Sequence, residues 1–255
     1  MRDRLIPAVA GRRCPKESSE PMKPEMSVWM RAPYAAPNGI EATEEGLWVV
    51  DQFTDRTALL EWGTPHEYGC TRILREIPTE SSTTSGLSYG GGCLWLTANG
   101  PGDRWRLRRP TDAESGEIFQ VDPATGQTLK RFPLPGGGGS HGLEYDHFDA
   151  ETIWLTTLKS QTLTQVGIAD WSIRHTLPLP YPSGHGVVRD AQTLWVVFKP
   201  ERAIVRLDVR DGTLLDEIRI EEGMPEPHCL TRQGPDLLYC DASTGWIVRI
   251  RDVPA

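Results

Sequence analysis

Three of the six histidines stand at corresponding points of similar short segments. His141 lies in GSHGLE, His185 in SGHGVV and His228 in EPHCLT, while APNGIE and TSGLSY place Asn38 and Ser85 at the same point. Neutral imidazoles are good ligands for zinc and other first-row divalent ions, and a three-histidine set leaves a coordination position for water or substrate. If the fold brings these segments together, the histidines can hold a divalent ion.

The segments are anchors of an internal repeat that recurs about every 40 to 60 residues. After each anchor the pattern predicts a short strand, a polar turn, an apolar strand and two further strands. This period is typical of a four-stranded propeller blade. We therefore predict an all-β fold, a five-bladed β-propeller of four-stranded blades. The second strand of each blade carries an aromatic residue expected to pack between blades: Trp48, Trp95, Trp154, Trp195 and Tyr239.

The two ends of the repeat predict how the ring closes. The last unit stops after its third strand, within Gly245–Val253, whereas Ser27–Arg31 reads as one strand before the first anchor. We expect this N-terminal strand to complete the last blade, because that pairing removes an exposed sheet edge. Residues 25–255 then form a single propeller domain, preceded by a flexible segment, 1–24, rich in Pro, Lys and Glu.

Strand direction predicts where the anchors lie. In an antiparallel blade the start of the first strand and the end of the second share one edge, so all five anchors are expected around one mouth of the central channel. Glycine follows four of them, which suits close backbone approach: Gly39, Gly86, Gly142 and Gly186. Three readings of the converging imidazoles stay open: a metal site, a metal-free acid/base or hydrogen-bonding trio, and structural histidines. His66, His147 and His175 fall off the repeat and are predicted on the surface.

Basic residues are expected beside this mouth. Lys159 and Lys199 occupy equivalent positions in two blades, and the insertion Ala98–Glu117 adds Arg104 and Trp105 together with Arg106, Arg108 and Arg109. Cations around a site favour an anionic substrate. The residues expected to contact the substrate are Lys159, Lys199, Arg104, Trp105, Asn38 and Ser85. A loop of this length in a compact domain is usually functional or mobile, so it could form a lid carrying Trp105; the alternative is a solvated loop.

Acid/base candidates lie in the same region of the repeat. Asp51, Glu226 and Asp241 are predicted near the mouth, and we expect the general base to be Asp51, Glu226 or Tyr34. Glu41 and Glu144 stand three residues beyond their anchors, on the other sheet face by strand parity. They are predicted to orient an imidazole.

Composition limits the partners. The net charge is −8 and the pI about 5.3, and an acidic balance argues against nucleic-acid or membrane-surface binding. The five cysteines include no CxxC pair, which fits reduced thiols. The N-terminal residues are too weakly apolar for a secretory signal, so we expect a soluble, cytoplasmic protein with a small-molecule substrate.

The pattern P-x-G-I…G-L-W-V, from Pro37 to Val49, resembles the virginiamycin B (streptogramin) lyase family and, more loosely, other propellers of that superfamily. The resemblance implies a propeller in which a divalent ion and histidine acid/base chemistry at the channel mouth open a cyclic depsipeptide by elimination. His185 and His228 are the positions that could match. That family has more than five blades, and three histidine anchors resemble the zinc site of peptidylglycine amidating lyase, another propeller.

The function predicted from these features is a metal-dependent lyase acting on a small anionic or cyclic substrate. Zinc is the first choice of metal, with Mg or Mn as alternatives. Metal-dependent hydrolysis of an ester or lactone uses the same parts. A non-catalytic ligand- or protein-binding propeller, in which the histidines are incidental, is the third possibility.

Overall fold

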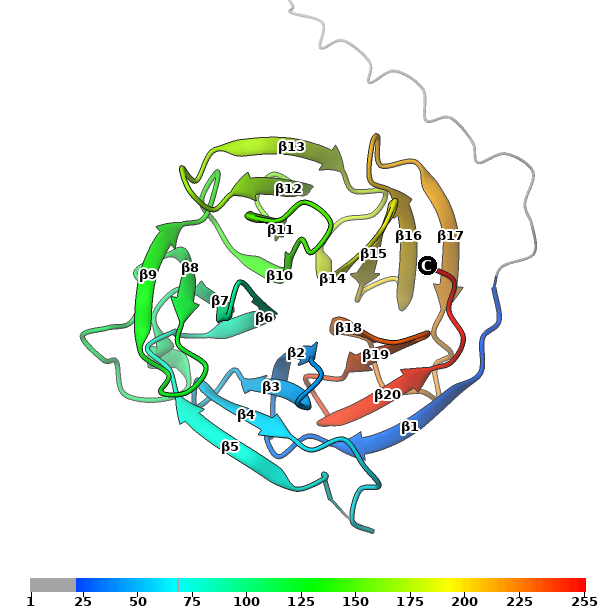
Figure 1. The fold of residues 1–255 in the computed structure, drawn as a ribbon, viewed down its shortest axis with the longest axis horizontal. Helices are drawn as coiled ribbons and strands as arrows, with labels where there is room; N and C mark the ends of the chain where they lie inside the picture. The colour runs from blue at the N-terminus through cyan, green and yellow to red at the C-terminus, as the bar shows by residue number, and fades with distance from the viewer. Residues whose placement is uncertain (1–21, 68) are drawn as a thin grey trace, which may run out of the picture.

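A computed structural model describes residues 22–67 and 69–255, and its strands form five four-stranded antiparallel sheets arranged in a ring (Figure 1). This confirms the predicted five-bladed propeller. Most of the predicted flexible segment, 1–24, lies outside the described residues. Within the described part of the chain, no helix is long and apolar enough to cross a membrane.

Each blade is a simple meander from the channel to the rim. Blade 1 comprises β2 (Pro37–Ala42), β3 (Leu47–Asp51), β4 (Arg56–Leu60) and β5 (Ile73–Pro78). Blade 2 comprises β6 (Thr84–Gly90), β7 (Cys93–Asn99), β8 (Gly116–Val121) and β9 (Thr128–Pro133). Blade 3 comprises β10 (Ser140–Tyr145), β11 (Thr152–Thr157), β12 (Thr162–Gly167) and β13 (Ile173–Pro178). Blade 4 comprises β14 (Gly184–Asp190), β15 (Thr193–Phe198), β16 (Ala203–Asp208) and β17 (Leu214–Arg219). Blade 5 comprises β18 (Cys229–Gln233), β19 (Asp236–Cys240), β20 (Trp246–Ile250) and β1 (Met26–Arg31).

The N-terminal strand closes the ring, as predicted. β1 pairs antiparallel with β20, from Met26 opposite Ile250 to Arg31 opposite Trp246. A bulge between Val28 and Met30 shifts the register, and Met30 is only 1% exposed. The last blade therefore has no unpaired β20 edge.

Apolar residues hold neighbouring blades together. The five aromatic residues of the second strands are fully buried. Trp48 lies in one apolar cluster with Leu87 and Leu94 of blade 2, and Trp195 lies in another with Tyr239, between blades 4 and 5. The predicted inter-blade role of these aromatic residues is confirmed. The four cysteines of the described residues, Cys70, Cys93, Cys229 and Cys240, are free thiols.

The first strands β2, β6, β10, β14 and β18 surround the axis (Figure 1). Their approach is close enough to require glycine at two of the predicted positions. A Cβ on Gly142 would lie 2.0 Å from the carbonyl oxygen of His185, and one on Gly186 would lie 2.4 Å from the amide nitrogen of Leu230. The sequence of the repeat thus allows the anchors to meet at the axis.

Candidate metal centre

The three anchor histidines meet at one mouth of the channel. The ring centroids of His141 and His185 are 4.5 Å apart, with the rings nearly parallel. The ring of His228 stands edge-on to both, 5.4 Å from that of His141 and 4.7 Å from that of His185. One nitrogen from each ring can be chosen so that all three lie within 4.8 Å of one another. The predicted convergence is therefore present in the structure.

Burial keeps the three imidazoles neutral. His185 and His228 are 7% and 5% exposed, and His141 is half-buried. Burial and the charge of His185 lower the pKa of His141 to about 3, and burial lowers the pKa of His185 to about 4. Burial, with the other two histidines and Lys199, holds the pKa of His228 well below its usual value. Neutral imidazoles have the lone pairs that a metal ion requires.

The hydrogen bonds of the three rings leave nitrogen atoms available. The Nδ1 of His185 lies 2.7 Å from the carbonyl oxygen of Ser183, a contact that makes Nδ1 the donor and leaves Nε2 with its lone pair. The Nδ1 atoms of His141 and His228 are buried without a hydrogen-bond partner among the described residues. Unpartnered buried nitrogen atoms are costly. A divalent ion shared by the rings would fit this donor set.

An ion pair lies beside the histidines. The Nζ of Lys199 is 3.1 Å from a carboxylate oxygen of Glu226. Both charges influence the cluster, since Lys199 lowers the pKa of all three histidines and Glu226 opposes that effect at His185. Asp241 accepts hydrogen bonds from the Glu226 amide at 3.0 Å and from the Thr244 hydroxyl at 2.7 Å. Lys199 and Glu226 are thus predicted polar residues whose charges act on the histidines.

The other two anchors are tied into neighbouring blades. The Nδ2 of Asn38 donates to the Thr84 carbonyl at 3.3 Å, and its Oδ1 is buried without a partner among the described residues. The Ser85 hydroxyl donates to the Ser140 carbonyl at 2.5 Å and accepts from Asn99 at 2.5 Å. The predicted substrate-binding role of Ser85 conflicts with these contacts, because its hydroxyl is used between blades. Sequence analysis missed Asn99, which links blades 2 and 3.

Two of the three predicted bases serve the structure instead. The buried carboxylate of Asp51 accepts from the Ala36 amide at 3.1 Å and from the amide and hydroxyl of Thr54 at 2.9 and 2.8 Å. The Tyr34 hydroxyl donates to Glu76 on the outermost strand of blade 1, at 3.0 Å. Burial, with Glu76, raises the pKa of Tyr34 above its ordinary value. Neither residue is placed to act as a base at the histidines.

Glu41 and Glu144 do not orient an imidazole. Glu41 accepts from Thr231 at 3.1 Å and from Ser88 at 3.4 Å, and Glu144 accepts from the same Ser88 hydroxyl at 3.4 Å. The Arg189 amide also donates to Glu144, at 3.1 Å. The prediction placed these carboxyl groups on the correct strands but with the wrong partners. The inner strands of neighbouring blades lie close enough around the channel for their side chains to bond to one another, and these contacts satisfy both carboxyl groups.

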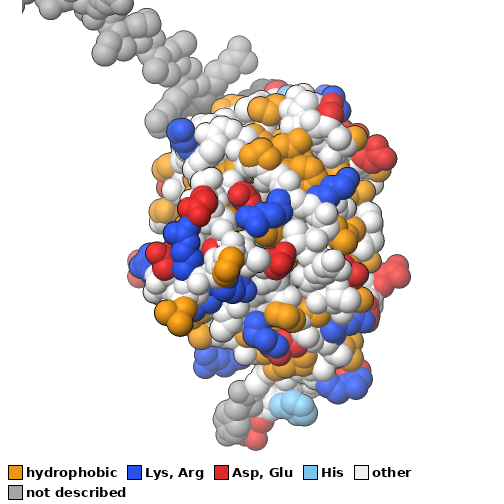
Figure 2. All heavy atoms as spheres, turned by 90° about the vertical axis from the view of Figure 1, so that its left-hand side faces the viewer, with side chains coloured by type: hydrophobic (Ala, Val, Ile, Leu, Met, Phe, Trp, Pro, Cys, Tyr) orange, Lys and Arg blue, Asp and Glu red, His pale blue; other side chains and the backbone are white. Residues whose placement is uncertain are grey.

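The insertion is fastened to the body of the protein. Arg106 forms ion pairs with Asp55 and Asp112, both at 2.7 Å, and Arg109 contacts the same two carboxylates. Arg108 pairs with Glu114. The predicted arginine-rich rim is therefore wrong for Arg106, Arg108 and Arg109, whose charges are compensated. Basic and acidic side chains are likewise interspersed on the side of the ring that carries β9 (Figure 2).

Three predicted rim residues remain exposed. Arg104 lies over the ring of Trp105 at 4.6 Å, and Trp105 packs against Phe53 with ring centroids 4.5 Å apart. Lys159 is exposed beside Gly138. These residues can contact a ligand above the mouth, but none has a hydrogen bond or stacking contact with the histidines. Of the other histidines, His66 and His147 are exposed, as predicted, and His175 is half-buried with its Nε2 3.1 Å from the Arg210 carbonyl.

The low pKa values predict a pH dependence of stability. An unfolded histidine takes up a proton near pH 6.5, whereas His185 and His141 in the fold do so only near 4 and 3. The unfolded state therefore binds more protons between these limits. In metal-free protein each histidine should cost about 1.4 kcal/mol of unfolding free energy per pH unit as pH falls from 6.5 towards 4.

Urea unfolding of chelator-treated protein at several pH values measures this effect. Replacing His185 with Gln removes one titrating group, and the difference between the two proteins separates its contribution from that of the carboxylates. The variant should lose stability less steeply than the parent below pH 6.5. Parallel curves would contradict the neutral state of His185.

The fold and this histidine cluster define the class: a β-propeller with a three-imidazole site at one mouth of its channel. The chain shares its β-propeller fold with solved structures that include a virginiamycin B lyase. Its sequence matches no family model and no curated protein.

Solved structures share the architecture at low sequence identity. Glutaminyl cyclase from Myxococcus xanthus superposes with a TM-score of 0.68 at 11% identity, over 92% of this chain and 100% of that one. Virginiamycin B lyase from Staphylococcus aureus gives 0.51 at 19% identity, over 85% of this chain and 66% of the lyase. A catalytically inactive histidine-to-alanine variant of that lyase, solved with quinupristin, gives 0.52 at 18% identity. These similarities establish the fold.

Proposed function

We propose that this protein is a metal-dependent enzyme, a lyase acting on a small anionic or cyclic substrate at the histidine mouth of the channel. His141, His185 and His228 would hold one divalent ion, with zinc the first choice and Mg or Mn the alternatives. The observation that carries the proposal is the set of three neutral imidazoles with nitrogen atoms within 4.8 Å, two of which have a buried, unpartnered Nδ1 among the described residues.

Each residue of the site then has a chemical role. A divalent ion supplies Lewis acidity to a substrate oxygen. Glu226 is the proton acceptor that remains after Asp51 and Tyr34 are excluded by their contacts. Its carboxylate lies 3.1 Å from the Nζ of Lys199. Lys199 would bind an anionic group of the substrate in place of Glu226. Lys159, Arg104 and Trp105 would contact parts of the substrate above the mouth.

The names of the structural relatives support an enzyme. Both are named for catalytic activities, and the virginiamycin lyase variant that lacks one histidine is described as inactive. A hydrolase for an ester or lactone is the runner-up, because a metal and an adjacent carboxylate also activate water. Product analysis in ¹⁸O-labelled water separates the two, since hydrolysis incorporates solvent oxygen and elimination does not.

The central test is metal content. Protein purified without chelator should contain about one divalent ion per chain, measured by elemental analysis. His185→Ala should lower the affinity for zinc at least about 100-fold and abolish turnover, because it removes a ligand rather than a neighbouring group. His66→Ala, an exposed histidine away from the cluster, is the matched control and should keep its metal.

Two outcomes would count against the proposal. One is a folded His185→Ala protein that retains zinc with unchanged affinity. The other is wild-type protein that takes up no divalent ion after reconstitution with zinc, which would favour the non-catalytic propeller that binds a ligand or protein.

A further inference from the structure

A cavity of about 740 Å³ lies at the opposite mouth of the channel from the three histidines. The strand order places it there, because each first strand runs from its anchor at one mouth to its turn at the other. The cavity is lined by turns after first strands, such as Thr43–Glu45 and Gln233–Gly234, and by Trp62 from the β4–β5 connection. A volume of this size can enclose a small organic molecule.

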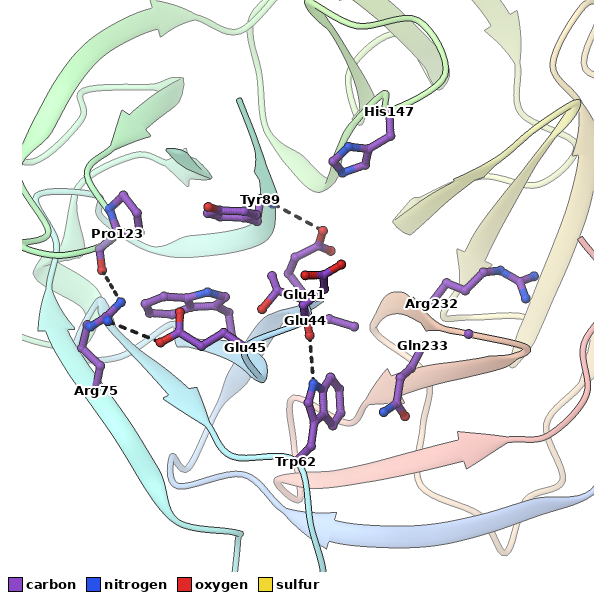
Figure 3. A pocket seen from close by; sticks show the side chains of 14 residues that line it. Glu41, Glu44, Glu45, Trp62, Arg75, Tyr89, Pro123, His147, Arg232 and Gln233 are labelled. Atoms are coloured by element: carbon purple, nitrogen blue, oxygen red, sulfur yellow. Dashed lines mark hydrogen bonds and ion pairs between the residues drawn. The ribbon is translucent and has the colours of Figure 1, made fainter. Parts of the chain in front are cut away.

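Aromatic side chains form part of its wall: Trp48, Trp62 and Tyr89. Trp62 is held in place, because its Nε1 donates to the Thr43 carbonyl at 2.8 Å and its ring stacks on Trp29 with centroids 5.8 Å apart. In Figure 3 Glu41 and Glu44 lie in the middle of the ring of labelled side chains, between Tyr89 and His147 on one side and Trp62 on the other. The cavity therefore combines apolar surface with carboxylates.

The charges of the cavity do not cancel. Arg75 pairs with Glu45 at 3.4 Å and donates to the Pro123 carbonyl, and Arg232, which also lines the cavity, pairs with Asp190 at 2.7 Å. Glu41 and Glu44, by contrast, have no ion-pair partner within residues 22–67 and 69–255. The two arginines are thus compensated and two carboxyl groups remain. A cation is the complementary ligand.

We propose that this second mouth, which we call the acidic mouth, binds a small organic cation, with its ammonium group against Glu41 and Glu44 and its apolar body against Trp62 and Tyr89. Aromatic walls and carboxylates are the two means by which proteins recognise alkylammonium groups. The inference does not rest on the proposed function, because the cavity and the histidines lie at opposite ends of the inner strands.

Binding at Glu41 is coupled to a proton. Glu41 is 7% exposed, and burial raises its pKa to about 8. Its neighbour Glu144 shares Ser88 with it, and burial, with the charge of Glu41, raises the pKa of Glu144 well above its usual value. The titratable and charged groups on the surrounding inner strands, towards this mouth, are Tyr89, Glu144, Tyr145, Arg189, Asp190, Cys229 and Arg232, and His147 follows β10 in the cavity wall. At neutral pH Glu41 therefore holds a proton, which a bound cation would displace.

Choline and 3,3-dimethylbutan-1-ol are suitable probes, since they have nearly the same shape and only choline carries a charge, at any pH. Isothermal titration calorimetry of the full chain should show saturable choline binding at least about 10-fold tighter than that of the alcohol. Titrations at pH 7 in buffers of different ionisation enthalpy should show that choline releases a proton from the protein.

Two variants locate the binding. Glu41→Gln should weaken choline binding at least about 10-fold and abolish the proton release, while Glu44→Gln, at an exposed position, should weaken binding without affecting the proton. Glu222→Gln is the control: this exposed carboxylate lies between β17 and His228, on the histidine side, and its loss should leave choline binding unchanged. The proposal is overturned if choline shows no saturable binding, if the alcohol binds equally well, or if Glu44→Gln and a folded Glu41→Gln both bind choline like the parent.

Discussion

Deleting residues 1–31 should prevent the ring from closing. The deletion removes β1, so β20 loses the partner with which it pairs from Trp246 to Ile250. It also removes Met30, 1% exposed in the core that joins blades 5 and 1, whose burial alone is worth about 1.5–3 kcal/mol. An unpaired strand edge templates association. We expect aggregation or loss of the cooperative thermal transition, measured by size-exclusion chromatography and differential scanning calorimetry.

A shorter deletion separates closure from mere truncation. Removing residues 1–21 leaves β1 intact and should change the melting temperature by little. If the protein lacking residues 1–31 stays monomeric and melts like the one lacking residues 1–21, then the pairing of β1 with β20 does not hold the ring together.

Replacing Asp55 with Asn should destabilise the fold by about 3–5 kcal/mol, the cost of breaking one side of a buried ion pair. The Asp55 carboxylate, 1% exposed, receives Arg106 at 2.7 Å and the hydroxyl of Thr84 at 2.9 Å. Its loss leaves Arg106 and Arg109 with Asp112 as their remaining carboxylate. The measurement is urea unfolding followed by tryptophan fluorescence.

Asp170→Asn is the matched control. Asp170 forms an ion pair with Arg174 at 3.0 Å, but both side chains are about half exposed, at 53% and 49%. An exposed pair of this kind contributes little to stability, because solvent and salt screen the two charges. Equal losses in the two variants would show that the insertion is not anchored through Asp55.

The ion pairs of the insertion could not be predicted from the sequence. The arginines of Ala98–Glu117 suggested a basic rim because sequence shows their number but not their partners. Asp55 is 51 residues from Arg106 along the chain. No local sequence pattern predicts that ion pair, because it forms only when blades 1 and 2 lie side by side.

Much of the histidine site was predictable, because its elements repeat. Asn38, Ser85, His141, His185 and His228 occupy one phase of a regular meander, so equivalent positions had to meet at one mouth. The roles of Tyr34 and Asp51 could not be predicted, because a hydroxyl or carboxylate near a mouth can point to the axis, to the rim or into its own turn. Their observed partners, Glu76 and Thr54, satisfy them away from the histidines.

The sequence by itself determined the number of blades, the strand that closes the ring and the mouth at which three histidines meet. The repeat period and the strand direction can be read locally, and both are the same in every blade. Only the tertiary structure decided which polar groups are satisfied and which are left free. It paired the arginines of the insertion, joined Glu41 to Glu144 through Ser88, and left the Nδ1 of two histidines without a partner among the described residues. Those outcomes depend on contacts between blades, where burial makes each unpaired charge or nitrogen costly.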